Sequence, residues 1–105
     1  MRPTRLLSQN LRLTLFTRVN CSLCDVVKHT LDQVQKRRPF IYAEVDVMKQ
    51  KEWTRAYQYE VPVLHIQKPV SAGADPEVLT EAKKLFHRFT QEELEKAMDE
   101  VERAN

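Results

Sequence analysis

The sequence predicts a single α/β domain in which a four-stranded mixed sheet is flanked by helices, in the order β-α-β-α-β-β-α. Strand-like and helix-like patterns alternate in the first half of the chain, which favours parallel strands joined by right-handed crossovers. Two short strands then follow with only a loop between them, as in an antiparallel hairpin. A helical pattern with its own start signal closes the chain.

The first strand and the first helix are the clearest elements. Apolar and polar residues alternate from Leu11 to Phe16, which indicates a strand. A turn signal at Asn20 precedes a Cys-Ser-Leu-Cys motif. From its second cysteine onward, apolar residues recur at helical spacing up to Pro39, which ends the helix. These residues are Cys24, Val27, Leu31 and Val34.

The remaining elements are shorter. Ile41, Ala43, Val45 and Val47 form one face of a second strand, and a second helix is predicted over 49–58, with Trp53 and Tyr57 packed on the core. The third strand covers 61–66, a loop 68–76 and the fourth strand 85–89. Thr90 and Glu93 form a capping box. Leu94, Ala97, Met98 and Val101 continue the final helix.

Size and composition restrict the class of protein. The chain has 105 residues, which suits one domain, and 42% hydrophobic with 30% charged residues is an ordinary globular balance. We expect residues 1–10 to be a flexible N-terminal segment and residues 11–105 to be the domain. No apolar run approaches the roughly 20 residues that cross a bilayer, so no membrane association is expected. A monomer is expected.

Charge gives little information on partners. The net charge is +2, and the basic run Lys36-Arg37-Arg38 suits a helix C-terminus, where the dipole favours cations. No aromatic residues are interleaved with it, so nucleic-acid binding is not expected. The arginine-rich, acid-poor start resembles a mitochondrial targeting segment, but a strand beginning at Leu11 leaves only about ten residues for one. We therefore expect the cytoplasm first and mitochondria second.

The motif Cys21-Ser22-Leu23-Cys24 carries the chemistry. Unpaired N–H groups and the positive end of the dipole at a helix start favour a thiolate, and a free cysteine has a pKa of about 8.5. Cys24 lies nearly one turn deeper on the same side, where it can attack a mixed disulfide formed at Cys21. The sequence thus predicts Cys21 as nucleophile, with a lowered pKa, and Cys24 as resolving thiol.

Other interpretations compete with a redox pair. The two cysteines could be small buried hydrophobes, which suits Cys24 but leaves the spacing unexplained. A structural zinc site needs four Cys or His ligands, and this chain offers no second pair, so no metal is expected. Asp25 in the first turn opposes a nearby thiolate, whereas Arg18 could offset that charge.

The order of elements and these residues together resemble the glutaredoxin-like branch of the thioredoxin superfamily. The matching pieces are Leu13-Thr14-Leu15-Phe16 leading into Cys21-Ser22-Leu23-Cys24-Asp25, and Val61-Pro62-Val63 opening the third strand. The similarity runs from about Leu11 to Val101. It implies a thioredoxin-like fold and a thiol–disulfide oxidoreductase that acts on disulfide-containing or glutathionylated proteins.

The resemblance also implies a glutathione site. It places Arg18 against a glutathione carboxylate and makes Pro62 cis, so that the backbone of Val61 pairs with a cysteinyl peptide. A solvated arginine and an ordinary edge-strand proline also fit the sequence. Two features depart from the family: Ser22 and Leu23 replace a proline and an aromatic residue, and no Gly-Gly pair follows the fourth strand, near Arg88 and Phe89.

Two alternative functions remain open. The groove could bind a partner protein without catalysis, the thiols being incidental. The chain could also carry an iron–sulfur cluster through Cys21, with glutathione across a dimer, because thiolates ligate such clusters.

Overall fold

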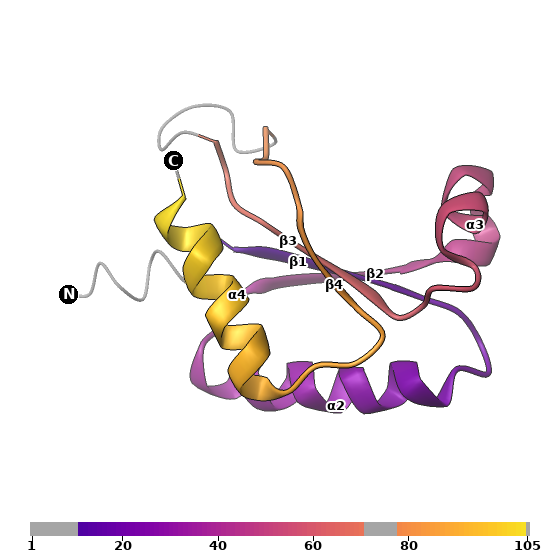
Figure 1. Ribbon diagram of the computed structural model, residues 1–105, viewed down its shortest axis with the longest axis horizontal. Helices are drawn as coiled ribbons and strands as arrows, with labels where there is room; N and C mark the ends of the chain where they lie inside the picture. The colour runs from indigo at the N-terminus through magenta and orange to yellow at the C-terminus, as the bar shows by residue number, and fades with distance from the viewer. Residues whose placement is uncertain (1–10, 71–77, 105) are drawn as a thin grey trace.

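The structure, a computed structural model, describes residues 11–70 and 78–104. The expected N-terminal segment 1–10 and most of the expected loop 68–76 lie outside the described residues. The order of elements is the predicted one (Figure 1). The elements are β1 (Arg12–Thr17), α2 (Ser22–Arg37), β2 (Ile41–Asp46), the short 3₁₀ helix η1 (Val47–Lys49), α3 (Lys51–Tyr57), β3 (Val63–Gln67), β4 (Lys83–Phe86) and α4 (Gln91–Arg103).

The sheet is mixed, as predicted. Its strand order is β2-β1-β3-β4, so β1 and β3 are central and β2 and β4 are the edges. β1 pairs in parallel with β2 through the crossover helix α2, whereas β3 pairs antiparallel with β1 and with β4. Phe16 lies opposite Val45 on one side and Val63 on the other. The end of β1 and the start of β3 therefore meet at one end of the sheet.

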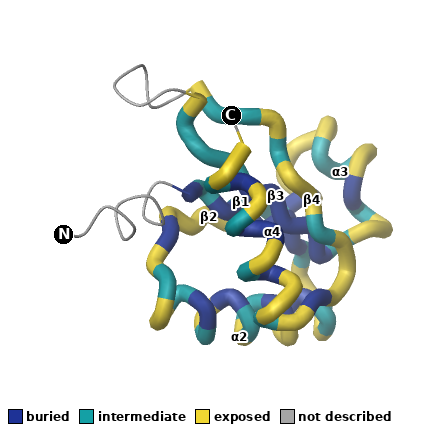
Figure 2. Tube along the Cα trace, turned by 60° about the vertical axis from the view of Figure 1, so that its left-hand side comes forward, coloured by how far each residue is buried: buried dark blue, intermediate teal, exposed yellow. Residues whose placement is uncertain are grey.

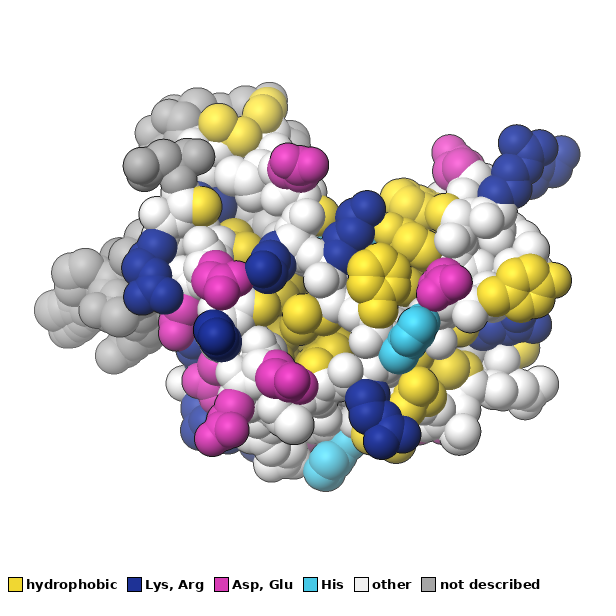
Figure 3. Space-filling model, in the orientation of Figure 1, with side chains coloured by type: hydrophobic (Ala, Val, Ile, Leu, Met, Phe, Trp, Pro, Cys, Tyr) yellow, Lys and Arg dark blue, Asp and Glu magenta, His cyan; other side chains and the backbone are white. Residues whose placement is uncertain are grey.

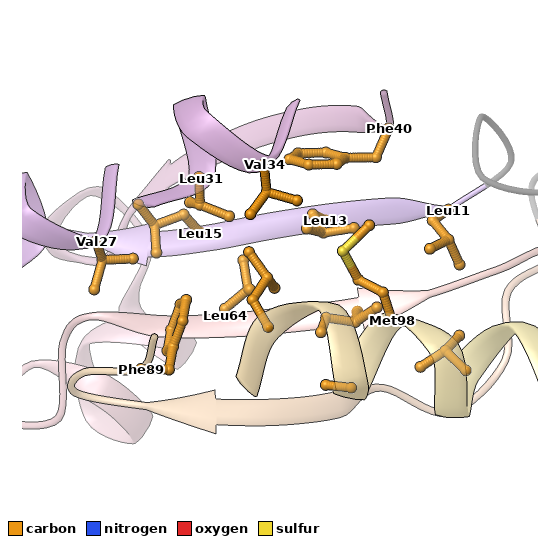
Figure 4. Close-up of a cluster of buried hydrophobic side chains, with 14 residues drawn as sticks. Leu11, Leu13, Leu15, Val27, Leu31, Val34, Phe40, Leu64, Phe89 and Met98 are labelled. Carbon is orange, nitrogen blue, oxygen red and sulfur yellow. The ribbon is translucent and has the colours of Figure 1, made fainter. Parts of the chain in front are cut away.

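One face of the sheet is covered by α2 and α4. Leucines of β1 and β3 point toward the apolar sides of both helices, and Figure 4 shows these side chains converging in one cluster. The predicted inward residues of α2 and α4 are all buried. The capping box predicted at the start of α4 is present, because Thr90 accepts from the Glu93 N–H and Glu93 accepts from the Thr90 N–H.

Among the described residues, α3 is the helix that packs on the other face, at one end of the sheet. Trp53 and Tyr57 pack there on Phe16 and Val63, as predicted from their spacing. Within the same cluster, the Tyr57 hydroxyl lies 2.9 Å from Nε2 of His65, a buried residue of β3. Burial and the neighbouring Lys84 lower the pKa of His65 to about 4, so the imidazole is neutral near pH 7.

The second strand is an exposed edge. Ile41, Ala43 and Val45 share one face, as predicted, but the first four residues of β2 are exposed. Figure 2 shows the contrast with the dark blue central strands. The cause is the strand order, which places β2 outermost, beyond the reach of α3 over most of its length.

Predicted boundaries of three elements were wrong. The third strand, predicted over 61–66, runs from Val63 to Gln67, because the Val61 N–H closes the end of α3 and Pro62 has no N–H to donate. The helix predicted over 49–58 begins at Lys51, after η1, because Asp46 caps η1 by accepting the Met48 N–H and Gln50 is extended, with φ −136°. The strand predicted over 85–89 runs instead from Lys83 to Phe86. It ends there because His87 takes the left-handed region, with φ 67°. Phe89 then turns into the core as a loop residue.

Ion pairs join the far end of α2 to α4. The Arg38 guanidinium donates to Asp99 Oδ1 at 2.6 Å and to Glu102 Oε1 at 2.9 Å, and it lies 3.8 Å from Glu95 Oε1. The side chains of Arg38 and Glu102 are each only 17% exposed. No helix in the described part of the chain is long and apolar enough to cross a membrane.

Candidate active site

The two cysteines of the motif stand at the start of α2. Cys21 is the N-cap residue, and its Sγ accepts a hydrogen bond from the Cys24 N–H at 3.1 Å. The two sulfurs are joined in a disulfide, with the Cα atoms 5.2 Å apart. Cys21 is partly exposed, whereas Cys24 is 1% exposed and packs inward. The structure therefore has an accessible outer sulfur and a buried inner one.

Local sequence explains why the chain turns into α2 at this point. β1 ends at Thr17, and Asn20 adopts φ 59°, a left-handed conformation that asparagine tolerates better than most residues. Cys21 is extended and starts the helix, and the Asp25 N–H donates to its carbonyl at 3.3 Å. The Cys24 N–H is therefore the first-turn donor that reaches the Cys21 sulfur. Asp25 itself is exposed.

Val61 and Pro62 lie at the same end of the sheet as the cysteines. The peptide bond between them is cis, as the family resemblance implies. The Val61 N–H already donates to the Tyr57 carbonyl at 3.1 Å, which closes the end of α3. Strand-like pairing of Val61 with a peptide would therefore depend on its carbonyl.

Arg18 contacts the protein rather than standing free in solvent. Its guanidinium donates to the carbonyl of Gln58, the residue after α3, at 3.1 Å. It thereby ties the loop before Cys21 to the segment that leads into Val61 and Pro62. A cavity of about 470 Å³ lies beside it, at the carboxyl ends of β1 and β2. Its lining includes Arg18, Lys49 and the buried Thr17.

His87 is a site residue that sequence reasoning missed. Its N–H donates to the Pro62 carbonyl at 2.8 Å, and its Nε2 lies 3.0 Å from Glu60 Oε1. It stands just after β4, where glycines would accept a positive φ without a Cβ clash. The sequence signal for this site is that no Gly-Gly pair follows the fourth strand, and that signal points to the neighbouring Arg88 and Phe89 rather than to His87.

The surface at this end of the sheet is partly apolar. Phe86 pairs with Val63 at the start of β3, Val19 lies in the loop before Cys21 and Tyr59 in the segment after α3, and the three are 43%, 69% and 84% exposed. Figure 3 shows hydrophobic side chains gathered on the side where α3 lies. Among residues 11–70 and 78–104, no three His, Cys, Asp or Glu side chains are grouped so that they could hold a metal ion.

Comparison with solved structures supports the fold. The chain is 26% identical to target protein XcR50 from X. campestris, with a TM-score of 0.61 over 84% of this chain and 96% of that one. A thioredoxin mutant from Halobacterium salinarum is 13% identical, with a TM-score of 0.66 over 95% and 81% of the two chains. Thioredoxin from Fasciola hepatica is 15% identical, with a TM-score of 0.60 over 91% and 85%.

The comparison with protein families is more specific. The model of the glutaredoxin-like domain (DUF836) matches residues 12–99, which contain every element from β1 to most of α4. The match includes the Cys21–Cys24 pair and Val61-Pro62. The chain adopts the thioredoxin-like fold and belongs to the glutaredoxin-like domain family.

Proposed function

We propose that the protein is a thiol–disulfide oxidoreductase in which Cys21 attacks, Cys24 resolves and glutathione supplies the electrons. One observation carries this proposal. The Cys21 sulfur is accessible, accepts the Cys24 N–H at the start of a 16-residue helix, and lies within bonding reach of a buried second sulfur. An N–H donor and a helix N-terminus both stabilise negative charge on that sulfur.

The exchange follows from this geometry. In the reduced protein, the Cys21 thiolate attacks one sulfur of a substrate disulfide, and the other substrate sulfur leaves as a thiolate that takes up a proton. Cys24 then loses its proton and attacks the Cys21 sulfur. This releases the second substrate thiol and forms the Cys21–Cys24 disulfide. The substrate has gained two electrons, which the cysteine pair has lost.

Glutathione is the reductant that the family resemblance suggests. Two molecules of glutathione would return the two electrons, each losing one thiol proton, and would leave as oxidised glutathione. Arg18, Lys28 and Lys49 in the lining of the neighbouring cavity support this choice, because glutathione carries two carboxylates, although Glu44 and Asp46 line the same cavity. Glu60 opposes glutathione binding, because it directly precedes Val61 and Pro62 and its carboxylate would repel the carboxylates of glutathione. That carboxylate lies 3.0 Å from His87 Nε2.

Cysteine variants test the proposal. We expect the wild-type protein to reduce the disulfides of insulin and a glutathionylated peptide when glutathione, glutathione reductase and NADPH are supplied. Cys21→Ser should abolish both reactions, and Cys24→Ser should trap a mixed disulfide that mass spectrometry detects. Lys36→Ala, an exposed change at the far end of the same helix, is the control and should keep the activity.

Three results would count against parts of the proposal. A folded wild-type protein that reduces no disulfide with any reductant would favour a non-catalytic binding module. Activity with a small dithiol but none with glutathione would retain the oxidoreductase and remove glutathione as its reductant. Full activity of Cys21→Ser would overturn the roles assigned to the two cysteines.

A further inference from the structure

The outer edge of β2 is open for pairing. β2 is the outermost strand on its side of the sheet, and no strand in the described part of the chain pairs with its outer edge. Ile41 and Tyr42 are 49% and 36% exposed. An open strand edge presents a row of N–H and C=O groups that can pair with another strand.

The two edges of this sheet differ in how they are protected. β4 has four residues and begins with Lys83 and Lys84, and a short, lysine-bearing strand resists edge-to-edge association. β2 has six residues, and the side chains on its open face are those of Ile41, Ala43 and Val45. Its Glu44 points to the opposite face, 3.7 Å from Lys28 of α2. Of these two edge strands, β2 is the one that has no charged side chain on the open face.

We propose that β2 pairs antiparallel with β2 of a second copy of this chain, around a twofold axis at Ala43. The main chain has the orientation that this pairing needs. The Ile41 N–H donates to the Leu11 carbonyl, so alternation turns the main-chain groups of Ala43 and Val45 toward β1 as well. Those of Tyr42 and Glu44 turn outward, where a second strand can bind them.

Side chains select the register. Opposed residues must point to the same face, so a twofold axis perpendicular to the sheet lies midway between the two copies of one residue of β2. An axis at Glu44 would place two carboxylates opposite each other, which is destabilising. An axis at Ala43 places Ile41 opposite Val45 of the second copy, and Tyr42 opposite Glu44 of the second copy. An axis at Tyr42 would pair only residues 41–43 of β2, whereas the axis at Ala43 pairs residues 41–45 and continues the apolar face across it.

The charges on α2 agree with the same axis. Lys28 lies 3.7 Å from Glu44, and Asp32, one turn further along α2, lies 3.6 Å from Lys36. Because the crossover helix α2 runs antiparallel to β2, one turn of α2 matches about two residues of β2, and Asp32 is level with Tyr42. The twofold axis exchanges the levels of Tyr42 and Glu44. It therefore sets Lys28 of each copy level with Asp32 of the other, and opposite charges attract across the pairing.

Association is measured by sedimentation velocity. An interface built on one strand pair is small, so we expect a weak dimer that forms between about 1 µM and about 1 mM protein. Ala43→Lys places two lysines opposite each other at the axis and should leave a monomer of 12.4 kDa at every concentration. Ala56→Lys, the same change on the exposed surface of α3, should associate like the wild type. Circular dichroism confirms that each variant is folded.

Cross-linking tests the register and does not depend on whether Ala43→Lys folds. Non-hydrogen-bonded antiparallel pairs have Cα atoms about 4.5 Å apart, within the roughly 4.4–6.8 Å that a disulfide spans. In a background with serine at both native cysteines, Ala43→Cys should form a covalent dimer under mild oxidation, and Ala56→Cys should not. A wild-type chain that stays monomeric, or a dimer that Ala43→Lys leaves intact, would overturn the proposal. If the wild type and the variants are all monomeric at every concentration, the result agrees with the monomer expected from the sequence. The outer edge of β2 would then be available to a strand of another protein.

Discussion

Replacing Arg38 by methionine should destabilise the fold without harming the active site. Arg38 binds carboxylates of α4, and Glu102 is as buried as Arg38, at 17% side-chain exposure. Asp99 is 46% exposed, so solvent screens its contribution. Methionine keeps the aliphatic volume but leaves the Glu102 carboxylate without its cation. Glu102 Oε2 already has no hydrogen-bond partner among the described residues.

The expected size follows from this burial. Breaking a fully buried ion pair costs about 3–5 kcal/mol, and an exposed pair contributes about 0.2–1 kcal/mol. Because the Arg38 cluster lies between these limits, we expect about 2–3 kcal/mol. A domain of this size loses roughly 4–8 °C per kcal/mol, so the Tm should fall by roughly 8–24 °C.

Thermal and urea unfolding with a matched control provide the test. Arg37→Met removes a neighbouring arginine that is 52% exposed and binds Glu95, and it should change stability by no more than about 0.5 kcal/mol. Disulfide reduction by folded Arg38→Met should match the wild type, because about 24 Å of helix separates the two ends of α2. Equal stability of Arg38→Met and Arg37→Met would refute the reasoning.

Three further predictions concern other parts of the molecule. The pKa of His65 is lowered from 6.5 to about 4 in the folded protein, so the unfolded chain takes up a proton first as the pH falls. The free energy of unfolding should therefore drop by at most about 3 kcal/mol between pH 6.5 and pH 4. Urea unfolding at several pH values should show this slope in the wild type and not in His65→Phe, although that variant also loses the bond to Tyr57. His87→Gly should be more stable than His87→Ala by about 1 kcal/mol, because both variants lose the contact with Glu60 and only glycine is unstrained at positive φ. Equal Tm values for the two variants would contradict a left-handed conformation at His87. Thr90→Ala should cost about 1 kcal/mol through loss of the α4 cap, and an unchanged urea midpoint would contradict it.

The local pattern of the chain was sufficient for the order of elements. Helical spacing placed Cys24 on the buried side of α2 and Cys21 at its start, and the capping box located the start of α4, because these signals depend on residues within a few positions of each other. The same locality explains the boundary errors at β4 and α3. The end of β4 depends on the conformation of His87 beside Pro62, and the break before α3 depends on the Asp46 cap and the extended Gln50.

The contacts of the site residues were decided by the tertiary structure. Sequence reasoning selected Arg18, Val61 and Pro62 through a family resemblance, but it could not show that Arg18 binds the Gln58 carbonyl or that His87 binds Glu60 and Pro62. These partners lie 40 and about 25 residues apart along the chain and meet only when β1, β3 and β4 align.

The order of the strands likewise followed from folding and not from any one segment. The alternation in 41–47 reads like that of a strand with one buried face, yet β2 lies at the edge with that face largely exposed. Periodicity records which residues share a face, since successive side chains alternate. Whether that face is covered depends on which elements pack against it, and those elements come from distant parts of the chain.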